Sequence, residues 1–218
     1  MEPADIKAFF ARLKKKNPKP ECELNYVSPY SLLVAIVLSA QTTDKNVNKV
    51  TPELFKSAPT PEKMLALGEE NVKKIIRSIG LFNSKAKNII ALSRDLIEKY
   101  GGVIPADFDE LQKLAGVGRK TANVFLNTYY GAPTFGVDTH VFRLGNRTGI
   151  AAGKTPVEVE KNLEKAVKGV IPDEDLKYVS HWLVLHGRYI CTAKKPDCPA
   201  CPVADLCPKN GVRPLFQR

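Results

Sequence analysis

Apolar residues recur at intervals of three and four along most of the chain, which is the spacing of an amphipathic helix. The breaks between these segments carry caps, glycines and prolines, and Thr60-Pro61 and Thr155-Pro156 each place an N-cap residue before a first-turn proline. The segment PTFGV, residues 133–137, is too short and too interrupted by glycine to build a sheet. The pattern predicts an all-helical protein with helices near 5–15, 29–40, 44–57, 61–67, 70–79, 84–99, 107–113, 119–129, 139–147, 156–168 and 174–190.

The longest apolar run, SLLVAIVLSA at 31–40, has about half of the roughly 20 residues that a membrane-spanning helix needs. It predicts a buried helix, and no membrane association is expected. The N-terminus carries Glu2 and Asp5 before any apolar stretch and lacks a cleavage site of small residues, so it does not read as a secretory signal. We therefore expect an intracellular, cytoplasmic protein.

The charge balance points to an acidic polymer as partner. The chain has 33 Lys and Arg residues against 23 Asp and Glu residues, and the net charge is +10. A folded basic domain gains affinity for DNA by releasing counterions, whereas a membrane binder more often carries one basic amphipathic helix. Charge alone separates these classes poorly, because many basic domains bind neither.

Four of the five cysteines form a C-x6-C-x2-C-x5-C array: Cys191, Cys198, Cys201 and Cys207. Prolines within the array forbid a regular helix, and it holds little apolar content that could order it by packing. In a reducing compartment, metal binding is favoured over two disulfides. Four thiolates suit tetrahedral zinc and a [4Fe–4S] cluster equally well, so the spacing leaves the metal open.

The stretch LAGVGRKTANVFLN, residues 114–127, places a glycine turn directly before a helix. Gly116 and Gly118 can adopt positive φ and turn successive N–H groups toward a phosphate, which the helix N-terminus also attracts. Ala122, Phe125, Leu126 and Tyr129 form a stripe that should face the core. Lys120 then points away from the core, on the face of Asn123, Val124 and Asn127.

Lys120 stands near a helix N-terminus, where the helix dipole disfavours a cation by only about 0.3–1 kcal/mol. A nucleophilic amine must be uncharged, so the charged form of Lys120 must be disfavoured by more than the helix dipole can supply. Desolvation in a cleft and the positive charge of the adjacent Arg119 would have to supply the remaining part. A solvated surface lysine is the competing reading. Asp138 precedes another helical segment, where an N-cap role is expected and leaves one carboxylate oxygen for a second task. The histidines, including His186, read as structural.

Taken together, LAGVGRKTANVFLN, the later VDTH and the cysteine array resemble the endonuclease III family. These are helix-hairpin-helix DNA glycosylases and abasic-site lyases that carry a [4Fe–4S] cluster. The resemblance extends from about LNYVSPYSLLVAIVLSAQTTD onward, over most of the chain. Two departures are the residue Ala115, where the family's hairpin usually has proline, and Phe82, where tyrosine is common. Neither touches Lys120 or Asp138.

The resemblance implies a role for each of these positions. It makes Lys120 the nucleophile, Asp138 the essential carboxylate, residues 114–118 the phosphate-binding hairpin and the four late cysteines the cluster ligands. It also implies that Gln41 and Leu81 enter the duplex around an extruded nucleotide; without it they would read as a helix-end polar residue and a core leucine. Contacts to DNA are further expected from Gly116, Gly118 and Arg119, and from Lys194 and Lys195, whose competing role is solubility.

The implied fold has two lobes, a six-helix barrel at 23–132 and an iron–sulfur lobe made of 1–22 and 133–218. The loop at 129–139 would cross between them. The expected partner is double-stranded DNA with oxidised pyrimidines or abasic sites, bound by a monomer. The alternatives are a monofunctional adenine or mismatch glycosylase of the same superfamily, a non-catalytic DNA-binding module and an electron carrier. Lys120 together with Asp138 favours the lyase.

Overall fold

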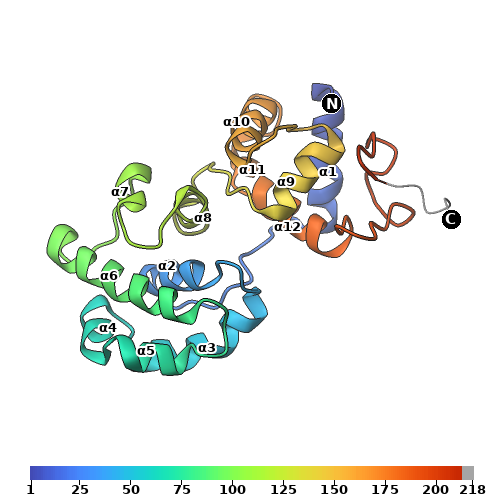
Figure 1. Ribbon diagram of the computed structural model, residues 1–218. Helices are drawn as coiled ribbons and strands as arrows, with labels where there is room; N and C mark the ends of the chain where they lie inside the picture. Colours follow the sequence, from blue (N-terminus) through green and yellow to red (C-terminus); the bar gives the residue numbers. More distant parts are fainter. Residues whose placement is uncertain (213–218) are drawn as a thin grey trace. The chain divides into compact units, whose positions relative to one another are not determined.

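The computed structural model describes residues 1–212, and the described chain folds into helices joined by turns and loops (Figure 1). The predicted all-α class is confirmed, and residues 133–137 form no strand. The helices are α1 (Pro3–Lys16), α2 (Pro29–Leu38), α3 (Asp44–Ser57), α4 (Pro61–Leu67), α5 (Glu69–Ile75), α6 (Phe82–Tyr100), α7 (Phe108–Gln112), α8 (Arg119–Tyr130), α9 (Thr139–Thr148), α10 (Pro156–Val167), α11 (Asp173–Leu176) and α12 (Val179–Tyr189).

The chain divides into two compact units. One unit is continuous and covers Cys22–Ala132, with α2 to α8. The other is discontinuous, because it combines Met1–Glu21 with the described chain from Pro133 onward. It therefore contains α1 and α9 to α12. No helix within residues 1–212 is long and apolar enough to span a membrane.

In the continuous unit, α2 is the central helix. Every residue from Tyr30 to Leu38 is buried, because an apolar helix with no polar face must be covered on all sides. Helices α8, α3 and α6 pack against it. Ser28 begins α2 by a capping box with Ser31, in which each side chain accepts a hydrogen bond from the other's backbone N–H. The segment predicted as a buried helix is thus the core of this unit.

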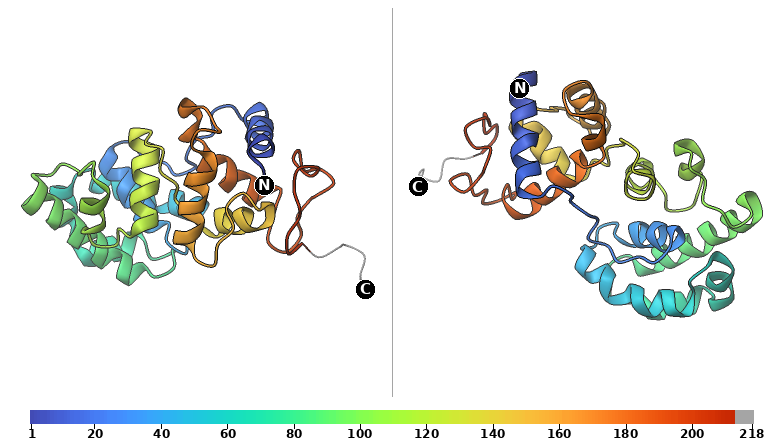
Figure 2. Two further views of the ribbon diagram at one scale, coloured as in Figure 1. Left: turned by 90° about the horizontal axis from the view of Figure 1, so that it is seen from above. Right: turned by 180° about the vertical axis from the view of Figure 1, so that it is seen from behind.

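In the discontinuous unit, α12 packs against α9 and α1, and α10 also contacts both of these helices. Phe9, Phe10 and Trp182 lie in its core, and the indole N–H of Trp182 donates a 2.7 Å hydrogen bond to the carbonyl of Asn17. This bond fixes the end of α1 against α12. After α12 the chain continues without regular helix through the cysteine array (Figure 2).

The helix expected over 174–190 is divided into α11 and α12. The N–H of Tyr178 donates to the carbonyl of Asp175 at 2.9 Å, a three-residue spacing that tightens the turn and ends α11. Asp175 is buried and binds Nζ of Lys14 on α1 at 2.6 Å. Pairing across the unit therefore anchors α11 separately, and periodicity alone did not show the break.

Candidate active site and cysteine pocket

The turn before α8 uses its two glycines differently. Gly116 has a φ of +77°, in the left-handed region that favours glycine. Gly118 is the N-cap of α8 with φ −91° and ψ 178°, an extended conformation open to any residue. Of the two glycines that could adopt positive φ, Gly116 does and Gly118 does not, so the reversal at Gly116 is sufficient to aim the chain at the helix start.

Gly116 is also required by space. A Cβ atom at this position would lie 3.0 Å from Cβ of Asn88 on α6 and 3.1 Å from Cγ1 of Val37 on α2. Gly118 has open space around it. Val117, between them, is buried and anchors the turn in the core. The turn is thus pressed against two helices on one side while Gly118 stays accessible.

Helix α8 buries Ala122, Phe125 and Leu126, as the apolar stripe predicts. Tyr129 is instead 43% exposed, and its ring stacks on Phe125 with 5.8 Å between centroids. Asn123 and Asn127 are buried, contrary to the expected polar face. Nδ2 of Asn127 donates to the carbonyl of Ala132 at 2.9 Å and so ties down the chain that follows the helix.

Lys120 is the second residue of α8 and is exposed, in agreement with its predicted direction away from the core. No side chain caps the helix at Gly118, so the helix start offers backbone N–H groups of the kind that bind anions. Arg119 lies with its guanidinium 5.0 Å from the centroid of the Phe108 ring. The first turn of α8 therefore carries two adjacent cations beside an accessible glycine.

Asp138 is the N-cap of α9, as the sequence predicts. Its Oδ1 atom accepts two hydrogen bonds of 2.8 Å, from the N–H groups of His140 and Val141. Within the described chain both bonds go to the same oxygen, so Oδ2 retains its acceptor capacity. The side chain is only half-buried. Asp138 belongs to the discontinuous unit and Lys120 to the continuous one.

Gln41 and Leu81 both have a left-handed backbone, with φ of 53° and 58°. Such a conformation is uncommon for residues other than glycine and costs on the order of 1–3 kcal/mol. Gln41 is exposed, and Leu81 is 55% exposed as the residue before α6. The reading of Leu81 as a core leucine is therefore wrong. Both side chains stand on strained turns of the same unit.

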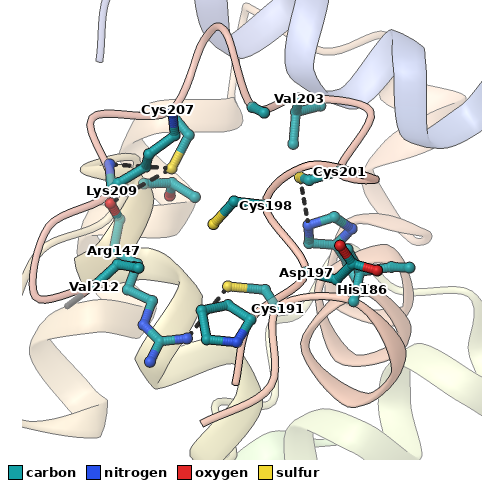
Figure 3. A pocket seen from close by; sticks show the side chains of 14 residues that line it. Arg147, His186, Cys191, Asp197, Cys198, Cys201, Val203, Cys207, Lys209 and Val212 are labelled. Carbon is teal, nitrogen blue, oxygen red and sulfur yellow. Dashed lines mark hydrogen bonds between the residues drawn. The ribbon is translucent and has the colours of Figure 1, made fainter. Parts of the chain in front are cut away.

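The four cysteines of the array line one pocket, and their side chains surround a common space (Figure 3). Including the open solvent at its mouth, the pocket holds about 390 Å³ of empty space. Within residues 1–212, no group of three or more His, Cys, Asp or Glu side chains is arranged to hold a single metal ion. A four-iron cluster does not require that arrangement, because it is a larger body that four separate thiolates can share.

Hydrogen bonds to sulfur support this fit. A guanidinium N–H of Arg147 donates to Sγ of Cys191 at 3.4 Å, and the N–H of Lys209 donates to Sγ of Cys207 at 3.3 Å. Such donors stabilise thiolates bound to iron and tune the cluster. Burial, followed by the charges of neighbouring cysteines, raises the pKa of Cys201. A bound cationic centre would relieve this repulsion, so the donor set fits a cluster.

Sequence reasoning did not find Arg147 and His186 beside the cysteines. Nε2 of His186 lies 3.5 Å from Sγ of Cys201, and burial together with the charge of Lys16 lowers the pKa of His186 to about 4. The available signal was that His186 shares the last turn of the helix that leads into Cys191. For Arg147 on α9 no local signal existed, because Cys191 is far away in sequence.

Lys194 and Lys195 are exposed in the first loop of the array. Arg147 holds this loop by donating to the carbonyls of Thr192 at 2.7 Å and Ala193 at 2.8 Å. The hydroxyl of Thr192 donates to the carbonyl of Lys195 at 2.6 Å. The backbone that carries the two lysines is therefore fixed while their side chains are free to reach a ligand.

The sequence matches known families and relatives over most of its length. The model of the HhH-GPD superfamily base excision DNA repair proteins matches residues 34–169. The model of the iron–sulfur binding domain of endonuclease III matches residues 191–207, the span of the four cysteines. The chain is 56% identical to endonuclease III of Haemophilus influenzae, over 91% of this chain and 92% of that protein. It is 52% identical to endonuclease III of Escherichia coli K12, again over 91% and 92%.

A solved structure shows the same fold. A trapped covalent intermediate of an endonuclease III with DNA superposes with a TM-score of 0.89 at 44% identity. The match covers 96% of this chain and 97% of that one. Both structural units and the cysteine pocket thus lie within the region of similarity.

Proposed function

The chain belongs to the endonuclease III family of base-excision DNA repair proteins, and we propose from this that it removes oxidised pyrimidines from DNA and cleaves the strand at the resulting abasic site. It carries the family's iron–sulfur domain. The observation that carries the proposal is the exposed Lys120 at the start of α8, directly after the Gly116 turn. A relative of the same fold has been trapped in a covalent bond with DNA.

The turn at 114–118 and the first residues of α8 bind a DNA phosphate. Gly118 leaves the backbone accessible, and the helix start favours an anion. Gln41 and Leu81 enter the duplex from their exposed turns and occupy space near the extruded nucleotide. Extrusion costs a few kcal/mol and is cheapest for a damaged base that pairs poorly, so unpairing itself selects for damage.

Lys120 performs the covalent chemistry. Its uncharged Nζ forms a bond to C1′ of the sugar while the bond between C1′ and the base nitrogen breaks, and the base leaves with a proton. The amine then loses a proton as the sugar ring opens, giving a Schiff base at C1′. The Schiff base acidifies C2′, and loss of a C2′ proton expels the 3′ phosphate by β-elimination. Water finally hydrolyses the Schiff base and restores Lys120.

Asp138 supports this reaction electrostatically. Its Oδ1 is used to hold α9, and Oδ2 is available to stabilise positive charge that develops on the sugar. The same carboxylate can accept and return protons during base release and elimination. A fixed N-cap is a suitable carrier for this charge, because two backbone hydrogen bonds set its orientation before substrate arrives.

Cys191, Cys198, Cys201 and Cys207 would hold the [4Fe–4S] cluster. The cluster supplies a cross-link among loop segments that have little core of their own, and no chemical step requires it. Lys194 and Lys195 on the ordered loop contact DNA phosphates. We further propose that the protein acts as a monomer on chromosomal DNA, and hence inside the cell, at the nucleoid if the cell is bacterial.

Borohydride trapping tests the proposal. The holoprotein is incubated with duplex DNA containing thymine glycol or an abasic site, and sodium borohydride reduces any Schiff base to a stable amine. We expect a covalent protein–DNA adduct that disappears in Lys120→Ala while DNA binding is retained. The matched control is Lys113→Ala, which removes an exposed lysine that forms an ion pair with Glu110 in the same unit.

Three results would contradict the proposal. An adduct that persists in Lys120→Ala would assign the nucleophile elsewhere. Base release without any adduct would indicate a glycosylase that lacks lyase chemistry, such as an adenine or mismatch enzyme. Binding without either activity would leave a DNA-binding module.

A further inference from the structure

A buried lysine lies next to the two strained turns. Lys85, in the first turn of α6, is only 3% exposed. Its Nζ donates a hydrogen bond of 2.7 Å to Oγ1 of Thr42. Within residues 1–212 this is the only side-chain hydrogen bond of Lys85, and no carboxylate pairs with it.

Keeping an ammonium group in this place is costly. Burial lowers the pKa of Lys85, as expected for a cation with little water around it. Lysine is almost never fully buried unless it is paired with an anion. A leucine or methionine would fill the same space without this cost. The charge and its single hydrogen bond therefore call for an explanation other than packing.

The position of Lys85 supplies that explanation. Its backbone N–H donates to the carbonyl of Leu81 at 3.0 Å, while its side chain binds Thr42, the residue after Gln41. The two turns also approach each other directly, since a Cβ atom on Gly80 would lie 4.0 Å from the carbonyl oxygen of Gln41. One residue thus contacts both left-handed turns, one through its main chain and the other through its side chain.

We propose that Lys85 is a positioning residue that joins the Gln41 and Leu81 turns through Thr42, so that the two side chains enter the duplex as one unit. The inference rests on the proposed function, because it concerns how these residues meet DNA. Strained φ values persist only where the surroundings hold them, and the Lys85–Thr42 hydrogen bond is a polar contact that spans the two turns. Fixing both turns before DNA arrives lowers the entropy lost on insertion.

The consequence depends on the substrate. A paired lesion must be unstacked and unpaired before it can be excised, so its removal needs both inserting residues in place. A preformed abasic site has no base to unpair, and strand cleavage there depends less on insertion. Loss of the Lys85 link should therefore reduce excision of a paired lesion more than cleavage at an abasic site.

The test compares Thr42→Val with Thr42→Ser. Valine has nearly the shape of threonine and removes the acceptor for Lys85, whereas serine retains the hydroxyl. A second pair compares Lys85→Met with Lys99→Met; Lys99 lies on α6 about 21 Å further along the helix and is exposed in an ion pair with Asp95. Each holoprotein variant is assayed on thymine glycol paired with 2-aminopurine, and separately on a preformed abasic site.

Two readouts separate positioning from folding. Fluorescence of 2-aminopurine, measured in the Lys120→Ala background, rises when the base opposite the lesion is unstacked. We expect Thr42→Val and Lys85→Met to reduce this rise and to slow thymine glycol excision about five- to thirtyfold, the effect of one or two kcal/mol from a lost hydrogen bond to a charged group. Cleavage of the abasic site should fall several-fold less, and Thr42→Ser and Lys99→Met should resemble the parent.

The inference is overturned if Thr42→Val and Thr42→Ser give the same fluorescence rise and the same excision rate. It is also overturned if Thr42→Val slows thymine glycol excision and abasic-site cleavage by the same factor. Should Lys85→Met fail to fold, the two Thr42 variants still decide the question. If the parent protein excises thymine glycol and forms the borohydride adduct, and Thr42→Val does both equally well, the role of Lys85 is wrong and the proposed function stands. A parent protein with neither activity removes the proposed function, and this inference with it.

Discussion

The two carboxylate oxygens of the single residue Asp138 have different roles. Oδ1 receives two backbone N–H groups and starts α9, so the carboxylate contributes to stability as well as to the proposed chemistry. Asparagine is as good an N-cap as aspartate, but it carries no negative charge. The structural and electrostatic roles can therefore be separated by substitution.

We expect the free energy of unfolding of Asp138→Asn to lie within about 0.5 kcal/mol of the parent's, because asparagine retains the N-cap. The variant should lose most base release, because it lacks the negative charge. Asp138→Ala should lose the same activity and about 0.5–2 kcal/mol of stability. Urea unfolding and single-turnover excision of thymine glycol measure the two effects. Equal unfolding of Asn and Ala variants would contradict the capping contribution.

The glycines of the α8 turn give a second prediction. Gly116→Ala should destabilise the protein by about 1–3 kcal/mol, because the new Cβ would be strained at positive φ and would press on Asn88 and Val37. Gly118→Ala should change the free energy of unfolding by no more than about 0.5 kcal/mol, since both the φ value and the open space at this position permit an alanine side chain. Thermal unfolding compares the two. A fall in DNA affinity for Gly118→Ala without loss of stability would support the proposed phosphate contact.

Sequence predictions for single residues are correct where the angle around the helix axis alone determines which way a side chain points. Lys120 is exposed as its angle predicts, yet Asn123 and Asn127 on the same face are buried. A helical period gives the angle around the axis and not what covers that side. Likewise, the sequence GVG permits two positive φ values, but of its two glycines Gly116 alone adopts one, where the turn packs closely against Asn88 and Val37.

At the scale of elements, most helices are readable because their caps are local. Thr60 and Thr155 begin α4 and α10 by accepting a backbone N–H, as their position before proline predicts. Helices α11 and α12 are instead divided at a turn where the carbonyl of Asp175 accepts from the N–H of Tyr178, while the Asp175 side chain binds Lys14 of α1. A contact over that sequence distance leaves no mark in local periodicity.

The cysteine array is the element that depends most on its cofactor. Val203 is its one fully buried apolar side chain among residues 191–207, so packing cannot hold these loops alone. Removing iron with a chelator after oxidation, or Cys198→Ala, should abolish the visible absorption of the cluster and open this segment to trypsin after Lys194; the bond after Lys195 precedes Pro196 and resists trypsin. Residues 22–132 should stay protease-resistant, because they have a separate core. Retained resistance at 194–195 after complete iron loss would show that hydrogen bonds suffice.

At the scale of the whole molecule, the charge of +10 predicts DNA binding that weakens steeply with salt. Replacing Lys194 and Lys195 by alanine should reduce the slope of log K against log salt by about 0.9 for each lost phosphate contact. Lys161→Ala with Lys165→Ala on α10 makes the same charge change as a control. Fluorescence anisotropy between 50 and 200 mM salt, about the range in which such slopes are measured, compares the pairs. Equal slopes for both pairs would assign Lys194 and Lys195 to solubility.

The discontinuous unit has a consequence for biosynthesis. Helix α1 leaves the ribosome well before α10 and α12, which cover Phe9 and Phe10. At roughly 5–20 residues per second the aromatic face of α1 waits on the order of ten to thirty seconds for its partners. Residues 22–132 can assemble during that interval, whereas α1 must stay uncovered or be shielded by a chaperone until α12 has been made.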